Sequence, residues 1–320
     1  MEITTHEPPT PIAEVERSVL SEAIVEIVSD SGEGAQKCGQ SLGAISAKMG
    51  NGVWTVEIIP AEIQPPARSR AGASGIRVRM GSNKITNMGD HAQLVVALNE
   101  QVIYDRIEQR AYKPGTFLLI EDKWKTDNSE KIRQEYAESL AMYREMGAVV
   151  YEIPMEVECL KIVRNARKGK NMWVLGMLCN IYDRDIEKTK DQIKYTFRKK
   201  SDEIVNSNID LMLAGYEYAN QNLDLKFQIP ANQNPGEQVV MNGNEAISLG
   251  VMAAGIDVCS MYPITPATSA SHHLAEAIEA TGVVVPKLAR ICNPCFNKFK
   301  GISILFFLQL LKLEFKAHYK

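Results

Sequence analysis

Short apolar runs alternate with longer amphipathic stretches through the first half of the chain. The runs at 93–98 and 116–121 are apolar almost throughout, which is typical of strands buried on both faces of a sheet. The stretches at 99–110 and 127–146 predict crossover helices, and Gly147 provides a stop for the second. Further strands are predicted at 23–28, 53–59, 76–80 and 149–153. This alternation predicts an α/β fold.

The pattern becomes helical from 155 to 221, where charged faces flank apolar positions. We therefore expect an α/β domain with a helical appendage at 20–222, after a flexible N-terminus at 1–19. Residues 223–239 are rich in Pro, Asn and Gln and predict a linker.

A second βα series follows the linker. It predicts an Ala- and Gly-lined helix at 242–255, a strand at 258–261 and a helix at 267–281. Residues 286–320 then form an aberrant basic and hydrophobic tail with no βα continuation. Since a doubly wound domain needs about one hundred residues or more, we expect the partial domain at 240–285 to have been cut short by a truncation or a frameshift.

Composition and charge limit the class of protein. The chain has 320 residues, of which 45% are hydrophobic and 23% charged, enough for two globular domains. A net charge of -3 gives no general attraction to nucleic acid or membranes, and the longest apolar run, 302–313, is too short to cross a bilayer. Dispersed cysteines and an acidic, Pro-rich start in place of a signal peptide predict a cytoplasmic protein with reduced thiols.

A glycine turn follows the first predicted strand. Gly32, Gly34 and Gly39 stand between that strand and the next helix, a place where backbone N–H groups can face an anion. A dinucleotide fingerprint needs a further glycine where Lys37 stands, which disfavours a stand-alone Rossmann dehydrogenase. A structural strand-to-helix turn is the favoured interpretation, and a phosphate or coenzyme A contact is the alternative.

Arginines cluster in and after a loop of small residues. Arg68 and Arg70 lie in the loop, and Arg77 and Arg79 alternate with apolar residues on the next strand. Such a cluster either holds a carboxylate or phosphate by bidentate contacts or forms a subunit interface, and we favour the interface. Turn residues at 81–84 predict a hairpin with one solvent-exposed face.

The most distinctive turn is the run Tyr262, Pro263, Ile264, Thr265 and Pro266. Its two prolines hold a rigid, non-helical turn at the carboxyl end of a predicted strand, where ligands of open α/β sheets bind. Thr265 is expected to direct its hydroxyl toward that crevice. The spacing alone leaves two interpretations open, a functional turn and a turn that only connects the strand to the next helix.

Two residue pairs could suggest a metal site. Cys292 and Cys295 have the spacing of half an iron–sulfur or zinc site, but no second pair accompanies them. His272 and His273 are adjacent on a predicted helix, so they point to different faces and suit neither a metal pair nor a catalytic dyad. No metal ligand is predicted in this chain.

The two βα series resemble one family of enzymes. Residues 242–255 and 262–269 resemble the start of the pyrimidine-binding domain of 2-oxo acid:ferredoxin oxidoreductases. The glycine turn and residues 71–79 and 90–99 resemble the gamma domain of the same family. A gamma domain ahead of an alpha domain is similar to the alpha subunit of the 2-oxoglutarate type, and the resemblance covers residues 23–285.

The resemblance implies roles for the Tyr262–Pro266 turn. Thr265 is expected to lie against thiamine diphosphate and the substrate carboxylate, with Tyr262, Pro263 and Ile264 lining the pocket. The thiamine diphosphate is expected to be shared with a beta subunit that carries magnesium and iron–sulfur clusters, with coenzyme A as co-substrate. No glutamate after Val285 matches the family's catalytic glutamate, and losing such a proton-transfer group typically costs about 10²–10⁴ in rate.

The implied activity is the oxidative decarboxylation of a 2-oxo acid, expected to be 2-oxoglutarate, to an acyl-CoA. Electrons are expected to reach ferredoxin through a higher hetero-oligomer that involves neither nucleic acid nor membrane. The isolated chain is expected to be inactive. The alternative is a non-catalytic assembly or binding fragment of the same complex.

Overall fold

The computed structural model of the chain describes residues 16–59, 74–232, 239–255 and 267–277. The chain divides into two compact units, Met1–Glu237 and Gln238–Lys320. The predictions for the turn at 262–266, for the Cys292 and Cys295 pair and for the tail at 286–320 lie outside the described residues.

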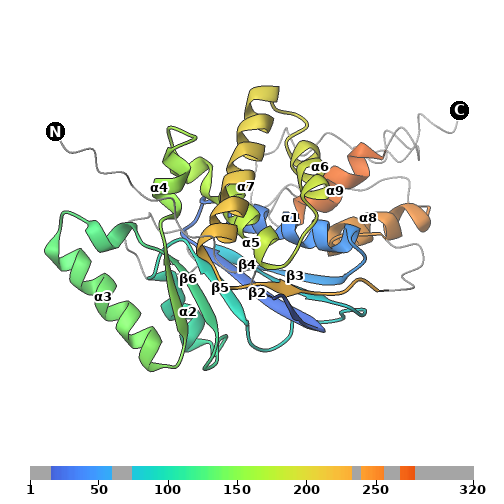
Figure 1. The fold of residues 1–320 in the computed structure, drawn as a ribbon. Helices are drawn as coiled ribbons and strands as arrows, with labels where there is room; N and C mark the ends of the chain where they lie inside the picture. Colours follow the sequence, from blue (N-terminus) through green and yellow to red (C-terminus); the bar gives the residue numbers. More distant parts are fainter. Residues whose placement is uncertain (1–15, 60–73, 233–238, 256–266, 278–320) are drawn as a thin grey trace, which may run out of the picture. The chain divides into compact units, whose positions relative to one another are not determined.

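The described part of the first unit is built on a six-stranded sheet with the order β3-β4-β2-β5-β6-β7 (Figure 1). The parallel strands are β2 (Glu22–Ser29), β5 (Leu94–Ala97), β6 (Phe117–Glu121) and β7 (Val149–Ile153). β4 (Ser74–Gly81) pairs antiparallel with both β2 and β3 (Gly52–Ile58). The six strands predicted between residues 23 and 153 and the α/β fold class are thus confirmed, whereas the strand predicted at 258–261 lies outside the described residues.

Helices cover both faces of this sheet (Figure 1). One buried core includes residues of α1 (Ala35–Lys48), α4 (Met155–Leu160), α5 (Lys170–Ile181), α6 (Ile186–Thr196) and α7 (Asp202–Asn222). The other includes residues of α2 (Val102–Glu108) and α3 (Glu130–Glu145). Along β2, Val25 and Ile27 belong to the first core, and Ile24 and Val28 belong to the second. Burial on both faces explains why the central strands are continuous apolar runs.

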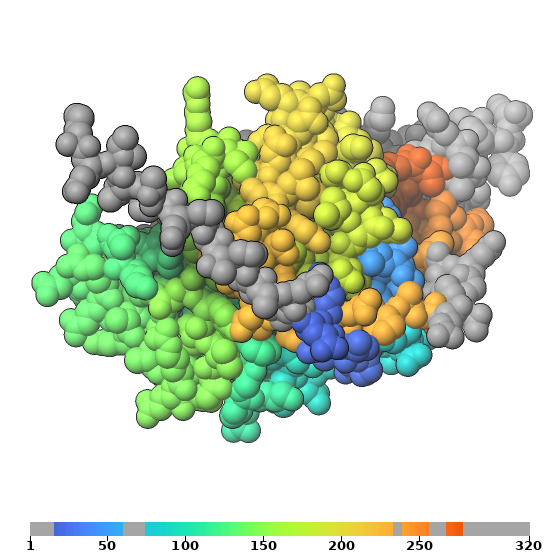
Figure 2. All heavy atoms as spheres, viewed as in Figure 1, coloured from blue at the N-terminus to red at the C-terminus, as the bar shows by residue number. Residues whose placement is uncertain are grey.

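The helix α5 lies inside the helical layer. All of its residues are buried, and it packs against α1 and α7. Gly176 of α5 and Gly215 of α7 permit a close approach, because a Cβ on Gly215 would lie 1.9 Å from the carbonyl oxygen of Trp173. Figure 2 shows α6 and α7 side by side at the surface, in yellow-green and yellow. The helical segment predicted as an appendage is therefore an integral layer of the domain.

The prediction of a hairpin with one solvent-exposed face around β4 was wrong. β4 lies between β3 and β2, and six of its eight residue pairs with β2 are apolar or glycine on at least one side. Arg77 on this strand is buried and forms an ion pair with Glu26 of β2. The alternation of arginines with apolar residues suggested that one face of the strand is exposed to solvent, but Arg77 faces the buried carboxylate of Glu26.

The segment predicted as a linker begins with packed residues. Leu223, Leu225 and Ile229 are buried in the same core as α5. Between them, β8 (Phe227–Gln228) pairs in parallel with β1 (Ser18–Val19). The linker prediction relied on the Pro, Asn and Gln content of 223–239, but apolar side chains at alternate positions fix the first part of this segment to the core. The segment therefore packs along the first unit before the second unit begins.

The described part of the second unit consists of α8 (Gly243–Ala253) and α9 (Thr268–Glu276), which confirms the two predicted helices. A capping box of Asn242 and Glu245 starts α8. The hydroxyl of Ser248 donates to the carbonyl of Ala270 at 2.7 Å, and His273 lies 3.2 Å from Glu245. Across the described residues of both units, none of the helices combines the length and apolar character that a membrane span requires.

Candidate functional site

A cleft opens at the carboxyl ends of the parallel strands in the first unit. Its volume is ≈ 450 Å³. Asp30 follows β2, Lys123 follows β6 and Glu156 follows β7, so three strand ends contribute to it. Its lining residues are Asp30, Glu33, Lys123, Trp124, Glu156, Leu160, Arg164, Asn165, Ala166, Arg167 and Lys170. This edge of a parallel sheet is where ligands of open α/β folds bind.

The floor of the cleft is organised around Lys170, the first residue of α5. Its side chain is 1% exposed, and its ammonium lies among three carboxylates. The distances from Lys170 Nζ are 3.3 Å to Glu33 Oε1, 3.6 Å to Glu156 Oε2 and 3.7 Å to Glu121 Oε2. Burial acts to lower the pKa of Lys170, but the three carboxylates outweigh it and raise that pKa above its ordinary value. Lys170 is therefore a fixed buried cation.

Glu121 is the most buried acid of this floor, with no exposed surface. Its Oε2 accepts a hydrogen bond from the backbone N–H of Glu156 at 2.9 Å, and its Oε1 accepts one from the backbone N–H of Lys123 at 3.3 Å. Burial nevertheless raises the pKa of Glu121 to about 7, although Lys170 acts in the opposite direction. The carboxyl group thus joins three walls of the cleft and titrates near neutrality.

Glu33 closes the floor on the side of the glycine turn. Burial raises the pKa of its carboxyl, and the charge of Lys170 opposes that rise. Its Oε1 faces Lys170, whereas its buried Oε2 has no hydrogen-bond partner within the described structure. An unpaired buried carboxylate oxygen favours a bound proton or a ligand with a donor group.

The rim of the cleft is mostly cationic. Arg164 and Arg167 are exposed, and Arg167 Nη2 donates to the carbonyl of Ser31 at 2.9 Å. Lys123 Nζ lies 3.1 Å from Glu156 Oε2 and 4.4 Å from the centre of the Trp124 ring. Cationic donors beside an aromatic ring suit a ligand that carries phosphate or carboxylate groups and a flat or apolar part.

The glycine turn borders this cleft. Gly32 and Gly34 have φ angles of +85° and +84°, which residues with side chains rarely adopt. A Cβ on Gly34 would lie 2.7 Å from Asn171 Nδ2, so the turn packs closely against the start of α5. Gly39 packs against β4 instead, since its Cβ would lie 2.1 Å from Ile76 Cγ2. The turn thus has the structural role we favoured, and it also carries Glu33 into the cleft.

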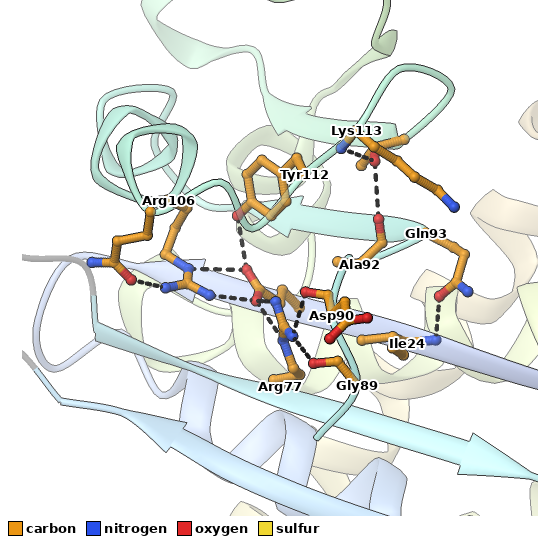
Figure 3. A network of polar contacts seen from close by, with 12 residues as sticks. Ile24, Arg77, Gly89, Asp90, Ala92, Gln93, Arg106, Tyr112 and Lys113 are labelled. Carbon is orange, nitrogen blue, oxygen red and sulfur yellow. Dashed lines mark hydrogen bonds and ion pairs between the residues drawn. The ribbon is translucent and has the colours of Figure 1, made fainter. Parts of the chain in front are cut away.

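The two described arginines of the predicted cluster make internal ion pairs. Arg77 Nη2 lies 2.7 Å from Glu26 Oε1, and Arg106 Nη2 lies 2.6 Å from the same oxygen. Tyr112 donates to Glu26 Oε2 at 2.9 Å, as Figure 3 shows together with the bonds from Arg77 to the carbonyls of Gly89 and Asp90. Arg79 pairs with Glu22 at 2.7 Å. The interface and ligand interpretations are therefore wrong for the buried Arg77, whereas they stay predictions for Arg79, and Arg68 and Arg70 lie outside the described residues.

The structure brings together charged residues that sequence reasoning missed. Lys170, Glu121 and Glu156 were not singled out, although Glu121 ends an otherwise apolar strand, which is a usable signal. Of the predicted site residues, Gly32 and Gly34 lie beside the cleft, and Tyr262, Pro263, Ile264 and Thr265 lie outside the described residues. Cys38, Cys159 and Cys179 are buried free thiols, and no cluster of possible metal ligands occurs among the residues that the structure describes.

Replacing Glu121 with glutamine is expected to flatten the pH dependence of folding stability. Because the pKa rises on folding from 4.5 to about 7, the contribution of this carboxyl is complete below the lower value and is lost as the pH rises through about 7. The loss amounts to about 3 kcal/mol at 1.36 kcal/mol per pKa unit.

Urea unfolding of both proteins at acidic and mildly alkaline pH measures this difference. Glu152→Gln is the matched control, because this acid on the neighbouring strand β7 faces Lys125 and Arg144 instead of the cleft. It should keep the wild-type pH dependence. An unchanged pH dependence in Glu121→Gln would contradict the assignment.

Comparison with known proteins identifies the family. The pyruvate ferredoxin/flavodoxin oxidoreductase family model matches residues 25–218, which is more than half of the chain. The 2-oxoglutarate oxidoreductase subunit KorA of Mycobacterium tuberculosis is 28% identical over 277 residues, which cover 82% of this chain and 42% of that protein. The 2-oxoglutarate:ferredoxin oxidoreductase of Magnetococcus marinus, solved with 2-oxoglutarate, coenzyme A and succinyl-CoA bound, matches with a TM-score of 0.65 and 25% identity.

The structural match covers 83% of this chain and 43% of the Magnetococcus marinus chain. The chain thus spans less than half the length of these two relatives. Both alignments are longer than the family match and so require residues outside 25–218. On the family match, the chain belongs to the pyruvate ferredoxin/flavodoxin oxidoreductase family.

Proposed function

We propose that this chain is part of the alpha subunit of a 2-oxo acid:ferredoxin oxidoreductase. With a beta partner, it would take part in the oxidative decarboxylation of a 2-oxo acid, with 2-oxoglutarate as the expected substrate, to an acyl-CoA. The observation that carries the proposal is the alignment with a 2-oxoglutarate oxidoreductase subunit over 82% of the chain. The expected complex is a cytoplasmic hetero-oligomer that passes electrons to ferredoxin.

The proposed domain organisation follows the same resemblance. A gamma-like domain occupies 20–222, and a partial pyrimidine-binding domain occupies 240–285. In the second domain, Thr265 would contact thiamine diphosphate and the substrate carboxylate, with Tyr262, Pro263 and Ile264 lining the pocket. Thiamine diphosphate supplies the carbanion chemistry when it is bound, and the beta partner would contribute magnesium and the iron–sulfur clusters.

The cleft of the first unit supports a role for coenzyme A. Its cationic rim at Arg164 and Arg167 and its aromatic side chain at Trp124 match the phosphates and the flat base of that co-substrate. Gly32 and Gly34 would bring the N-terminus of α1 close to the same phosphates. A coenzyme A complex is known for the Magnetococcus marinus enzyme, which is similar to this chain.

Co-expression with a beta subunit of this enzyme class tests the proposal. We expect viologen reduction that depends on a 2-oxo acid and on coenzyme A, and none from the isolated chain. Thr265→Val should lower kcat/KM by about 10² or more, because a positioned polar contact is lost in the transition state. The matched control is Thr196→Val, at the end of α6 in the first unit, which should retain the activity of the parent complex.

The alternative function is a non-catalytic assembly or binding fragment of the same complex. It predicts a stable complex with the beta subunit that reduces no viologen, with or without the Thr265→Val change. Failure to form any complex would contradict both functions.

A further inference from the structure

The charge balance on the floor of the cleft is unusual. Lys170 is a single buried cation shared by Glu33, Glu121 and Glu156. None of the three carboxylates comes closer than 3.3 Å to its ammonium, whereas a strong charge-assisted hydrogen bond is about 2.7–2.9 Å long. The cation is therefore divided among competing acids, and its full charge is available only if one of them becomes neutral.

Glu121 is the acid best placed to become neutral. Glu33 and Glu156 retain some exposed surface, at 11% and 32% of their side chains, but Glu121 has none. It is also the acid farthest from Lys170 Nζ, at 3.7 Å. Of the three acids, Glu121 therefore has the largest desolvation cost for its charged form. Its ion pair with Lys170, the longest of the three, offsets the least of that cost.

The groups around Glu121 leave its charged and neutral forms close in free energy. The groups that interact with it are Lys170 of α5, Glu156 and Cys159 of α4, Lys123 of the 3₁₀ helix Lys123–Thr126, Tyr136 of α3 and Asp122 beside it on the chain. Glu33 of the glycine turn shares Lys170 with Glu121. Only Lys123 and Lys170 among these carry positive charge. An anion that enters the cleft adds negative charge to this set and disfavours the Glu121 carboxylate further.

We propose that the cleft binds phosphate-like anions together with one proton, which the carboxyl group of Glu121 takes up. A neutral Glu121 releases Lys170 toward the cleft, where its charge adds to those of Arg164 and Arg167. Anion affinity then rises as the pH falls through neutrality. This inference rests on the proposed function only in treating the cleft as an anion site, and it adds a means of regulation by pH.

Thermodynamic linkage gives the sign and size of the effect. The pKa of Glu121, raised to about 7 by burial, is raised further when an anion is bound. Binding and protonation strengthen each other by the same factor. For one linked proton, the anion affinity should fall about fivefold to tenfold between about pH 6 and about pH 8.

Sulfate is the decisive probe, because it remains a dianion throughout the neutral range and contributes no titration of its own. Calorimetry of the full chain near pH 7, in two buffers of different ionisation enthalpy and at constant ionic strength, counts the protons taken up. We expect a substantial fraction of one proton for each sulfate bound. Coenzyme A forms a second arm, which distinguishes binding of a free anion from binding of a phosphate ester.

Variants locate both the proton and the anion. Glu121→Gln should abolish proton uptake and make sulfate affinity independent of pH, near its value at acidic pH, whereas Glu152→Gln should behave as wild type. The double change Arg164→Gln with Arg167→Gln should weaken sulfate binding at least tenfold if the anion lies in the cleft.

Three results would overturn the inference. They are the absence of sulfate binding at pH 6, proton uptake that survives in Glu121→Gln but disappears in Glu33→Gln, and affinity that the double arginine change leaves intact. The viologen assay is independent of all three. A complex that is active but shows no proton linkage would refute only this inference, and linkage in an inactive complex would refute only the proposed function.

Discussion

Replacing Gly215 with alanine is expected to destabilise the first unit by about 3 kcal/mol or more, enough to leave little folded protein. The added Cβ would lie 1.9 Å from the carbonyl oxygen and 2.7 Å from the carbonyl carbon of Trp173. These are backbone atoms of α5, so no side-chain rotation relieves the clash. The reciprocal contact is as close, because a Cβ on Gly176 would lie 1.8 Å from the carbonyl oxygen of Met212.

The two helices would have to separate to accept one methyl group. Trp173 has no exposed surface, and α5 is buried along its whole length, so separation would open the core between α1, α5 and α7. The usual gain from alanine in a helix, up to about 1 kcal/mol relative to glycine, is too small to offset this loss. The steric clash therefore determines that Gly215→Ala lowers the free energy of unfolding.

Gly250→Ala is the control for the glycine-to-alanine change itself. Gly250 is also in a helix, α8, and nothing in the described structure lies within 4 Å of the position of its Cβ. This variant should be as stable as the parent or slightly more so. Circular dichroism during urea unfolding measures both variants, and a parent-like midpoint for Gly215→Ala would show that the helices are not packed as described.

Much of the fold was predictable because its strands are continuous apolar runs. The runs at 93–98 and 116–121 became β5 and β6, each buried on both faces. Turn chemistry was equally informative, since Gly147 follows α3 with φ +85°. These features depend on neighbouring residues only, and sequence patterns report local preferences well.

The features that could not be predicted depend on partners far apart in sequence. Arg77 looked solvent-exposed because its strand alternates apolar and basic residues. Its true partner, Glu26, is 51 residues away, and Arg106 reaches the same carboxylate from 80 residues away. Only the strand order brings them together, and strand order is not encoded in local periodicity.

The candidate site divides in the same way. Gly32 and Gly34 could be identified because a glycine turn between a strand and a helix has a local signature. Lys170 could not, since it begins the apolar helix α5 and meets Glu33, after β2, and Glu121, at the end of β6, only when these elements are assembled. Thr265 remains a prediction from sequence, and the viologen assay described above tests it.

Replacing Glu26 with glutamine is expected to cost about 3–5 kcal/mol of folding stability, because removing one partner of a buried ion pair leaves uncompensated charge. Glu26 has no exposed surface, and it accepts hydrogen bonds from Arg77, Arg106 and Tyr112. Glutamine has the same shape but carries no charge, and its amide nitrogen is a donor facing donors. Both guanidinium groups would then be buried without their shared carboxylate.

Glu22→Gln provides a matched control on the same strand. Glu22 also pairs with an arginine of β4, Arg79, at 2.7 Å, but its side chain is 39% exposed. Water screens such a pair, so this variant should lose less than about 1 kcal/mol. Urea unfolding measures both changes. Equal losses for Glu22→Gln and Glu26→Gln would mean that burial does not set the strength of these pairs, whereas a loss confined to Glu26→Gln would establish the buried carboxylate as the residue that joins β2, β4 and α2.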